Sequence, residues 1–122
     1  MDLSDKSVLL VEDSKTAQIL CSSLLKKLWI AKYDLAANWQ EAVDMAKKKL
    51  YDIILMDIQM PLMDGIEATD KIRKLEKWTH PKIIAYTAYD DNFQIGESFD
   101  WKIQKPTNIL NFNKIIYDVL SQ

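Results

Sequence analysis

The sequence predicts an α/β domain in which a doubly wound, five-stranded parallel sheet is covered by helices on both faces. Short apolar stretches alternate with longer segments whose apolar residues recur at helical spacing, as in successive β-α units. Residues 53–56, Ile-Ile-Leu-Met, are apolar at four consecutive positions bounded by turn signals, which is typical of a strand buried on both faces. The connections are short, which favours right-handed crossovers within one parallel sheet.

A strand followed by a helix is predicted at the start of the chain. Residues 7–11, Ser-Val-Leu-Leu-Val, form a short apolar stretch that ends at Glu12 and Asp13. Ser14 has the side chain of a helix N-cap. Apolar side chains then recur at the spacing of one helix face. They belong to Ala17, Leu20, Cys21, Leu24, Leu25 and Leu28.

The second strand and the second helix are predicted between residues 29 and 50. The strand is placed within 29–36. Asn38 followed by Glu41 has the spacing of a capping arrangement at a helix start. A helical stripe of apolar residues continues after this pair, and it predicts a helix that packs on the sheet. The stripe consists of Ala42, Val43, Ala46 and Leu50.

The third strand is the apolar stretch at 53–56, which brings Asp57 to its carboxyl end. A turn follows, signalled by Met60-Pro61 and by Asp64-Gly65. The next helix is predicted from about residue 66 to residue 76. Its inward-facing residues are expected to be Ile66, Thr69, Ile72 and Leu75.

Two more strands and a final helix complete the predicted order. Residues 83–86 form a strand that ends at Thr87, and residues 101–104 form a strand that ends at Lys105. Asn108 is expected to start the last helix. The apolar stripe of that helix consists of Leu110, Phe112, Ile115, Ile116, Val119 and Leu120.

One helix of the regular alternation is weak. The segment 90–100 is polar, contains Gly96 and has little helical periodicity. We therefore expect a shortened or irregular fourth helix there. No repeat or linker interrupts the chain, so residues 1–122 are expected to form a single domain.

Composition excludes several classes of function. The 122 residues have a net charge of −2, and Arg73 is the only arginine, which argues against nucleic-acid binding. A single cysteine, Cys21, excludes an intrachain disulfide and fits a reducing compartment. The sequence contains neither a signal peptide nor an apolar stretch of the roughly 18 residues that span a membrane. We expect a cytoplasmic domain with no membrane partner.

Charged and polar groups gather at four predicted strand ends. They are Glu12 with Asp13, Asp57, Thr87 and Lys105. Parallel strands bring such ends to one edge of a doubly wound sheet, where ligands bind. Three carboxylates in one crevice repel one another unless a cation lies among them, and Mg²⁺ prefers oxygen ligands. With a lysine and a hydroxyl nearby, this set suits a phosphoryl group and an aspartate nucleophile.

The chain resembles the response-regulator receiver domains of two-component signalling over nearly all of its length. The resemblance rests on four motifs in this order: Glu12-Asp13, Asp57 to Gly65, Thr87-Ala88 and Lys105-Pro106. It implies a flavodoxin-like fold with strand order 2-1-3-4-5. Residues 59–65 particularly resemble receivers attached to hybrid histidine kinases, so the chain could be a single-domain regulator or part of a longer kinase.

The resemblance implies a phosphoacceptor and a magnesium site. Asp57 is expected to accept a phosphoryl group from the phosphohistidine of a histidine kinase or of a histidine phosphotransfer domain. Mg²⁺ is expected to bind Asp13, Asp57 and the backbone carbonyl of Gln59. Glu12 is expected to act largely through water, and Lys105 to pair with a phosphoryl oxygen.

The resemblance also implies a conformational switch and residues that set how long the phosphorylated state lasts. Thr87 is expected to move toward the phosphoryl group, Ala88 to leave room for it, and Pro106 to follow a cis peptide. Gln59 and Tyr89 occupy the positions that flank the attacking water during dephosphorylation. Because tyrosine is bulky, slow autodephosphorylation is our hypothesis.

The sequence departs from the family pattern on the face that normally carries the output. Lys102 stands where the family usually has a tyrosine or phenylalanine, and the spacing from Thr87 to Lys105 is shorter than usual. A phosphorylation-independent interaction module with a receiver fold is therefore the alternative. A third possibility is a stand-alone phosphohydrolase with an aspartate nucleophile. It would need a second aspartate where Gln59 stands, so the sequence argues against it. The output partner is left open.

Overall fold

The computed structural model describes residues 3–30, 32–58, 65–75, 81–87, 99–105 and 107–121. Strands and helices alternate along these residues until the last two strands. In chain order the elements are β1 (Ser7–Val11), α1 (Lys15–Lys27), β2 (Lys32–Ala36), α2 (Trp39–Lys48), β3 (Ile53–Asp57), α3 (Gly65–Arg73), β4 (Lys82–Thr87), β5 (Trp101–Gln104) and α4 (Ile109–Leu120). None of the helices among these residues is long and apolar enough to cross a membrane.

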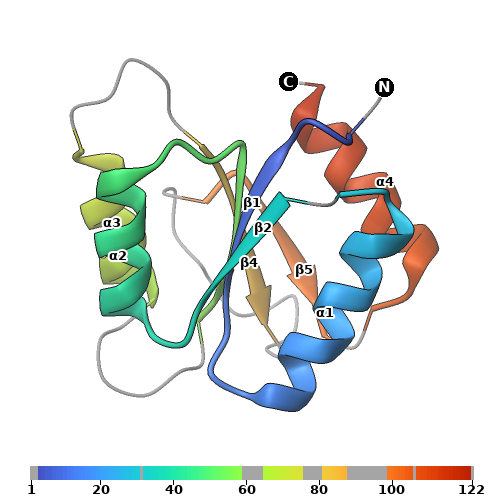
Figure 1. The fold of residues 1–122 in the computed structure, drawn as a ribbon, viewed down its shortest axis with the longest axis horizontal. Helices are drawn as coiled ribbons and strands as arrows, with labels where there is room; N and C mark the ends of the chain where they lie inside the picture. The colour runs from blue at the N-terminus through green and yellow to red at the C-terminus, as the bar shows by residue number, and fades with distance from the viewer. Residues whose placement is uncertain are drawn as a thin grey trace.

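The five strands form one parallel sheet in the order β2-β1-β3-β4-β5. This confirms the predicted strand number, direction and order. Helices α1 and α4 cover one face of the sheet, and α2 and α3 cover the other (Figure 1). The carboxyl ends of all five strands therefore lie along one edge, as the doubly wound fold requires.

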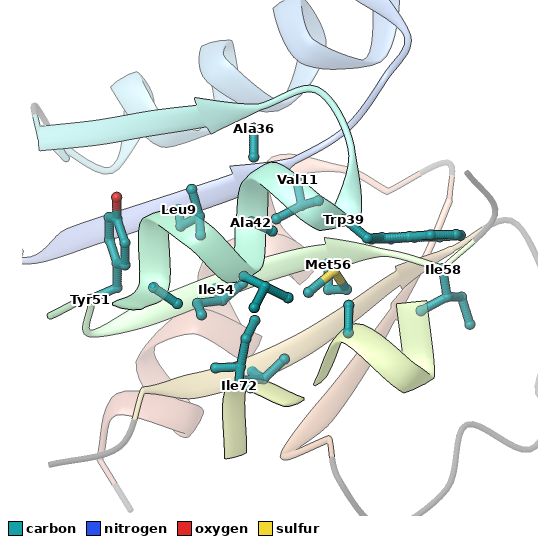
Figure 2. Close-up of a cluster of buried hydrophobic side chains, with 14 of the residues drawn as sticks. Leu9, Val11, Ala36, Trp39, Ala42, Tyr51, Ile54, Met56, Ile58 and Ile72 are labelled. Carbon is teal, nitrogen blue, oxygen red and sulfur yellow. The ribbon is translucent and has the colours of Figure 1, made fainter. Parts of the chain in front are cut away.

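The central strand β3 is buried along its whole length, and its side chains alternate between the two cores. Ile54 and Met56 pack in the cluster under α2 and α3 (Figure 2), whereas Ile53 and Leu55 pack in the cluster under α1 and α4. A strand buried on both faces must be apolar at every position, which explains the continuous apolar run. Asp57 follows in this alternation on the side of α1 and α4.

The predicted helix starts are confirmed. The Asn38 side chain accepts a hydrogen bond from the backbone N–H of Glu41 at 2.8 Å, and the Glu41 side chain accepts one from Ala37 N–H at 2.9 Å. Ser14 and Asn108 cap α1 and α4 through the same kind of side-chain acceptor. Each cap satisfies backbone N–H groups that have no partner inside the helix.

Three apolar residues that we assigned to buried stripes are exposed. Leu20 on α1 is 61% exposed and Leu110 on α4 is 78% exposed. Each lies beside the buried stripe of its helix. The buried residues are Cys21 and Leu25 in α1, and Phe112, Ile116 and Val119 in α4. Leu50 is 42% exposed because α2 ends before it, at Lys48.

The third helix is also shorter than predicted, because it ends at Arg73 instead of continuing to Glu76. Arg73 donates to the carbonyl of Pro81 at 2.9 Å and to Asp100 Oδ2 at 2.7 Å. Asp100 Oδ2 also accepts from the backbone N–H of Ile83 at 2.7 Å. These contacts tie the end of α3 to the starts of β4 and β5. The predicted irregular helix falls mostly on residues 88–98, which lie outside the described residues.

Candidate functional site

Three carboxylates meet at the carboxyl edge of the sheet. Glu12 and Asp13 directly follow β1, and Asp57 is the last residue of the adjacent strand β3. Each of the three offers one carboxylate oxygen, and these oxygens all lie within 4.8 Å of one another. Glu12 and Asp57 are buried, at 1% and 4% exposure, whereas Asp13 is exposed. The cluster is therefore rooted in the sheet and open to solvent on the side of Asp13.

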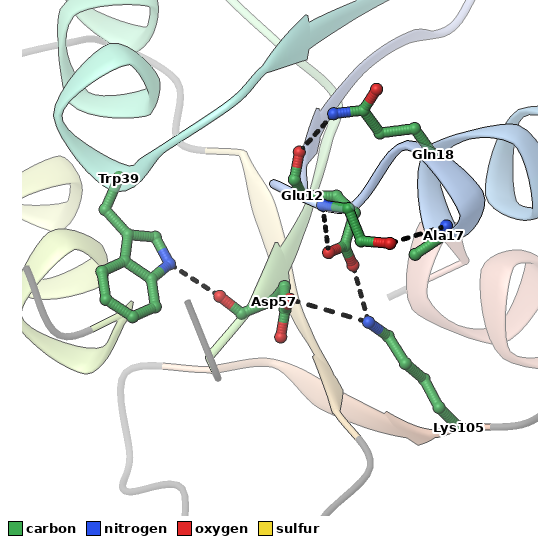
Figure 3. A network of polar contacts seen from close by, with 7 residues as sticks. Glu12, Ala17, Gln18, Trp39, Asp57 and Lys105 are labelled. Atoms are coloured by element: carbon green, nitrogen blue, oxygen red, sulfur yellow. Dashed lines mark hydrogen bonds and ion pairs between the residues drawn. The ribbon is translucent and has the colours of Figure 1, made fainter. Parts of the chain in front are cut away.

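Lys105 brings a positive charge to this cluster. Its Nζ lies 2.6 Å from Glu12 Oε2 and 3.7 Å from Asp57 Oδ2 (Figure 3). Lys105 follows β5, and β4 lies between β5 and β3, so the lysine side chain must cross β4 to reach the carboxylates. Its ammonium lies 4.7 Å from the centre of the Tyr86 ring on β4. Tyr86 thus stabilises the lysine ammonium through a cation–π contact.

Burial raises the pKa of Tyr86 above its ordinary value, and the nearby charges of Glu12 and Asp57 contribute to the same shift. The phenol therefore stays neutral at physiological pH and adds no fourth negative charge to the site. Burial also raises the pKa of Cys21 to about 12, although the positive charge of Lys105 acts in the opposite direction. This thiol is protonated and inert as a nucleophile or metal ligand.

The start of α1 fixes the orientation of Glu12. Its Oε1 accepts a hydrogen bond from the backbone N–H of Ser14 at 3.2 Å, and its carbonyl accepts one from Gln18 Nε2 at 2.6 Å (Figure 3). Its own backbone N–H donates to the carbonyl of Ala36 at 3.0 Å. We had not assigned Gln18 to the site. The sequence signal for it was its position in the first turn of the helix that follows the acidic pair, within reach of Glu12.

Trp39 is a second residue of the site that sequence reasoning missed. Its indole Nε1 donates a 2.6 Å hydrogen bond to the backbone carbonyl of Asp57 (Figure 3). Trp39 is the first residue of α2 and is 2% exposed. The helix begins just beyond the carboxyl end of β2, and this placement at the functional edge was visible in the sequence.

The structure brings together four of the predicted site residues: Glu12, Asp13, Asp57 and Lys105. Thr87 ends β4 and pairs with Gln104 of β5, but its side chain lies outside what the structure describes. The remaining predicted site residues lie outside the described residues. They are Gln59, Ala88, Tyr89 and Pro106.

The chemistry of the carboxylate cluster fits a small, hard divalent cation. All three donors are oxygens, and an octahedral ion with metal–oxygen distances of about 2.0–2.1 Å places its ligand oxygens about 3–4 Å apart. The three oxygens lie within 4.8 Å of one another, close enough for Asp13 and Asp57 to bind such an ion directly and for Glu12 to reach it through a water ligand. Asp13, on the open side of the cluster, leaves room for the water ligands that Mg²⁺ retains.

Comparison with known proteins identifies the family. The family model of the response regulator receiver domain matches residues 8–108. The chain is 40% identical over 109 residues to Two-component system protein A of Emericella nidulans, covering 84% of this chain and 16% of that protein. It is 36% identical over 127 aligned positions to Hybrid signal transduction histidine kinase I of Dictyostelium discoideum, covering 95% of this chain and 7% of that protein. The chain thus spans a small part of these relatives.

Solved structures agree with this assignment. The receiver domain of sensor histidine kinase PA1611 from Pseudomonas aeruginosa, determined with a magnesium ion in its active-site cleft, superposes with a TM-score of 0.86 at 30% identity over 96% of this chain and 98% of that chain. The receiver domain of the histidine kinase CKI1 from Arabidopsis thaliana, complexed with Mg²⁺ and BeF₃⁻, gives a TM-score of 0.85 at 29% identity over 98% of this chain and 93% of that chain. The chain belongs to the response regulator receiver domain family of phosphorelay signalling.

Proposed function

We propose that Asp57 is the phosphoacceptor of this receiver domain and takes its phosphoryl group from a phosphohistidine in a Mg²⁺-dependent reaction. The observation that carries the proposal is the convergence of three carboxylates within 4.8 Å, with the Lys105 ammonium in contact with two of them. An ordinary structural ion pair needs one carboxylate for one lysine. Three carboxylates at the carboxyl edge of a sheet repel one another, and this costs free energy unless a cation completes the site.

Mg²⁺ is the cation that this donor set suits best. Asp13 and Asp57 are the proposed direct ligands with the backbone carbonyl of Gln59, and Glu12 is proposed to act largely through water. When bound, the ion supplies positive charge to the oxygens of the phosphoryl group. The magnesium seen in the PA1611 and CKI1 receiver domains supports this choice.

The transfer step follows from the position of the Asp57 carboxylate. One of its oxygens forms a bond to phosphorus while the bond from phosphorus to the donor imidazole nitrogen breaks, and that nitrogen keeps the electron pair. In the structure, the Lys105 ammonium is paired mainly with Glu12, at 2.6 Å. We propose that it turns from Glu12 to a phosphoryl oxygen, which places positive charge where negative charge accumulates.

The proposed signal is a change in partner affinity that spreads from the phosphoryl group through Thr87 and Lys105. Ala88 is proposed to leave room for the phosphoryl group. Gln59 and Tyr89 are proposed to set the rate of dephosphorylation. The partners are a histidine kinase or a histidine phosphotransfer domain as donor and an output protein or domain as receiver of the signal. Because the relatives include hybrid histidine kinases, we propose the same type of phosphorelay for this chain, in the cytoplasm.

A groove beside the site offers a docking surface for the phosphohistidine donor. It has a volume of about 430 Å³ and is lined by α1, by Tyr86 and Lys105, and by Thr107 in the segment before α4. Its α1 wall includes Leu20, which is 61% exposed, and the neighbouring Ile19 is 69% exposed. A donor seated on this surface would lie beside Lys105, whose ammonium is 3.7 Å from Asp57 Oδ2.

The identity of the acceptor is tested by Asp57→Asn, which keeps the shape of the side chain but removes its nucleophilic charge. With acetyl phosphate and Mg²⁺, we expect intact-protein mass spectrometry to show one phosphoryl adduct on the wild type and none on the variant. Glu67→Gln, an exposed carboxylate on α3, is the matched control and should be modified like the wild type. A wild type that neither forms the adduct nor binds Mg²⁺ would favour the phosphorylation-independent interaction module.

The role of Lys105 is tested by Lys105→Met. The ammonium competes with Mg²⁺ for Glu12 and Asp57, so its removal should tighten Mg²⁺ binding by about five- to tenfold, equivalent to about 1–1.4 kcal/mol. The same variant should be phosphorylated more slowly, because a phosphoryl oxygen loses its positive partner. Titration calorimetry and acetyl phosphate kinetics measure the two effects. Lys49→Met, which removes an exposed ion pair with Asp34, should change neither. Weaker Mg²⁺ binding in Lys105→Met would contradict this assignment.

The docking surface is tested by Leu20→Glu, compared with the wild type for two phosphoryl donors. Transfer from a phosphorylated histidine phosphotransfer domain should slow by about tenfold, because a charge replaces an apolar contact. Phosphorylation by acetyl phosphate should not change, since this donor needs no protein surface. Trp29→Glu, at an exposed residue just past the C-terminal end of α1, is the control. Equal loss with both donors would show instead that Leu20→Glu disturbs the site itself.

A further inference from the structure

The backbone of Asp57 is held from the face of the sheet opposite to its carboxylate. The carboxylate lies with Glu12 and Lys105, whereas Trp39 belongs to the apolar cluster under α2 and α3. From that side the indole N–H reaches the Asp57 carbonyl at 2.6 Å. Figure 2 shows the ring near Ile58 at the end of β3, and Figure 3 shows its nitrogen directed at this carbonyl.

The indole acts at the point where pairing with one neighbouring strand stops. The register of β1 against β3 ends at Val11 and Met56, one residue before Asp57. The pairing of β3 with β4 continues to Asp57 and Tyr86. The Trp39 hydrogen bond therefore adds a side-chain restraint to the peptide unit that joins Asp57 to Ile58, at the terminus of the strand.

The indole itself is rigidly placed. Trp39 directly follows the N-cap Asn38, so the capped first turn of α2 sets its backbone. Gly65 at the start of α3 packs against the ring closely enough that an added Cβ would lie 3.1 Å from the indole nitrogen and 3.0 Å from Ile58 Cα. The absence of a side chain at Gly65 thus lets α3 close over both the ring and the residue after the acceptor.

We propose that Trp39 is a positioning residue for phosphoryl transfer. Its indole N–H orients the Asp57 peptide and thereby fixes where the carboxylate lies relative to the proposed metal ligands and Lys105. This inference rests on the proposed role of Asp57 as phosphoacceptor. Reactions that depend on alignment lose about 100-fold for a displacement near 1 Å, so a small rotation of this peptide is costly.

The test is Trp39→Phe, which retains an aromatic ring in the core but removes the N–H donor. At saturating Mg²⁺, we expect its rate of phosphorylation by acetyl phosphate to fall by about 10- to 100-fold while the protein remains cooperatively folded. Trp29→Phe removes an indole that is 81% exposed and should leave the rate unchanged. A folded Trp39→Phe that is phosphorylated within twofold of the wild-type rate would overturn the inference.

A measurement on the wild type separates positioning from simple core packing and holds even if Trp39→Phe does not fold. The indole N–H resonance of Trp39 should shift when Mg²⁺ and beryllofluoride bind, by more than that of Trp29, because the carbonyl it binds belongs to the acceptor. An unmoved Trp39 resonance in a protein that binds beryllofluoride would contradict the positioning role of Trp39 and leave the proposed function of Asp57 standing. A wild type that neither binds beryllofluoride nor is phosphorylated would refute the proposed function itself.

Discussion

Repulsion among the three carboxylates at the end of the sheet is the constraint around which the rest of the site is arranged. Their oxygens lie within 4.8 Å of one another, and Glu12 and Asp57 are almost fully buried. Water therefore screens these charges poorly, and the Lys105 ammonium must offset them. Lys105 therefore extends across β4 to the carboxylates. Tyr86, which stays neutral, contacts its ammonium there. A site held in this way suits a divalent cation, and it suits the proposed phosphoryl group to which Lys105 would turn.

The geometry of Asp57 depends on both faces of the sheet. Its carboxylate belongs to the α1 and α4 side, where the charges gather, while its carbonyl is bound by Trp39 from the α2 and α3 side. The close packing of Gly65 against the ring joins the start of α3 to the same point. A movement of α3 would therefore reach the proposed acceptor, Asp57, through the indole. This gives the proposed phosphoryl site a direct physical connection to the helical layer on the opposite face.

The fold could be predicted because its signals are local. The continuous apolar run of β3 reports burial on both faces, and Ser14, Asn38 and Asn108 report helix starts through their side-chain acceptors. The convergence of the acidic pair, Asp57 and Lys105 also followed, because parallel strands end at one edge. Leu20 and Leu110 were misplaced because a one-residue shift turns a side chain by about 100° around a helix. Trp39 was missed because no sequence pattern shows which carbonyl a buried indole will meet.

The measurement that tests the central claim most directly is chemical trapping of the phosphorylated residue. After treatment with acetyl phosphate and Mg²⁺, borohydride reduces an acyl phosphate so that the modified aspartate becomes homoserine, which peptide mass spectrometry locates in the sequence. We expect homoserine at position 57 and intact side chains at Glu12 and Asp13, even though all three carboxylates share the site. Homoserine at position 13, or a phosphoryl adduct that borohydride leaves unchanged, would contradict it.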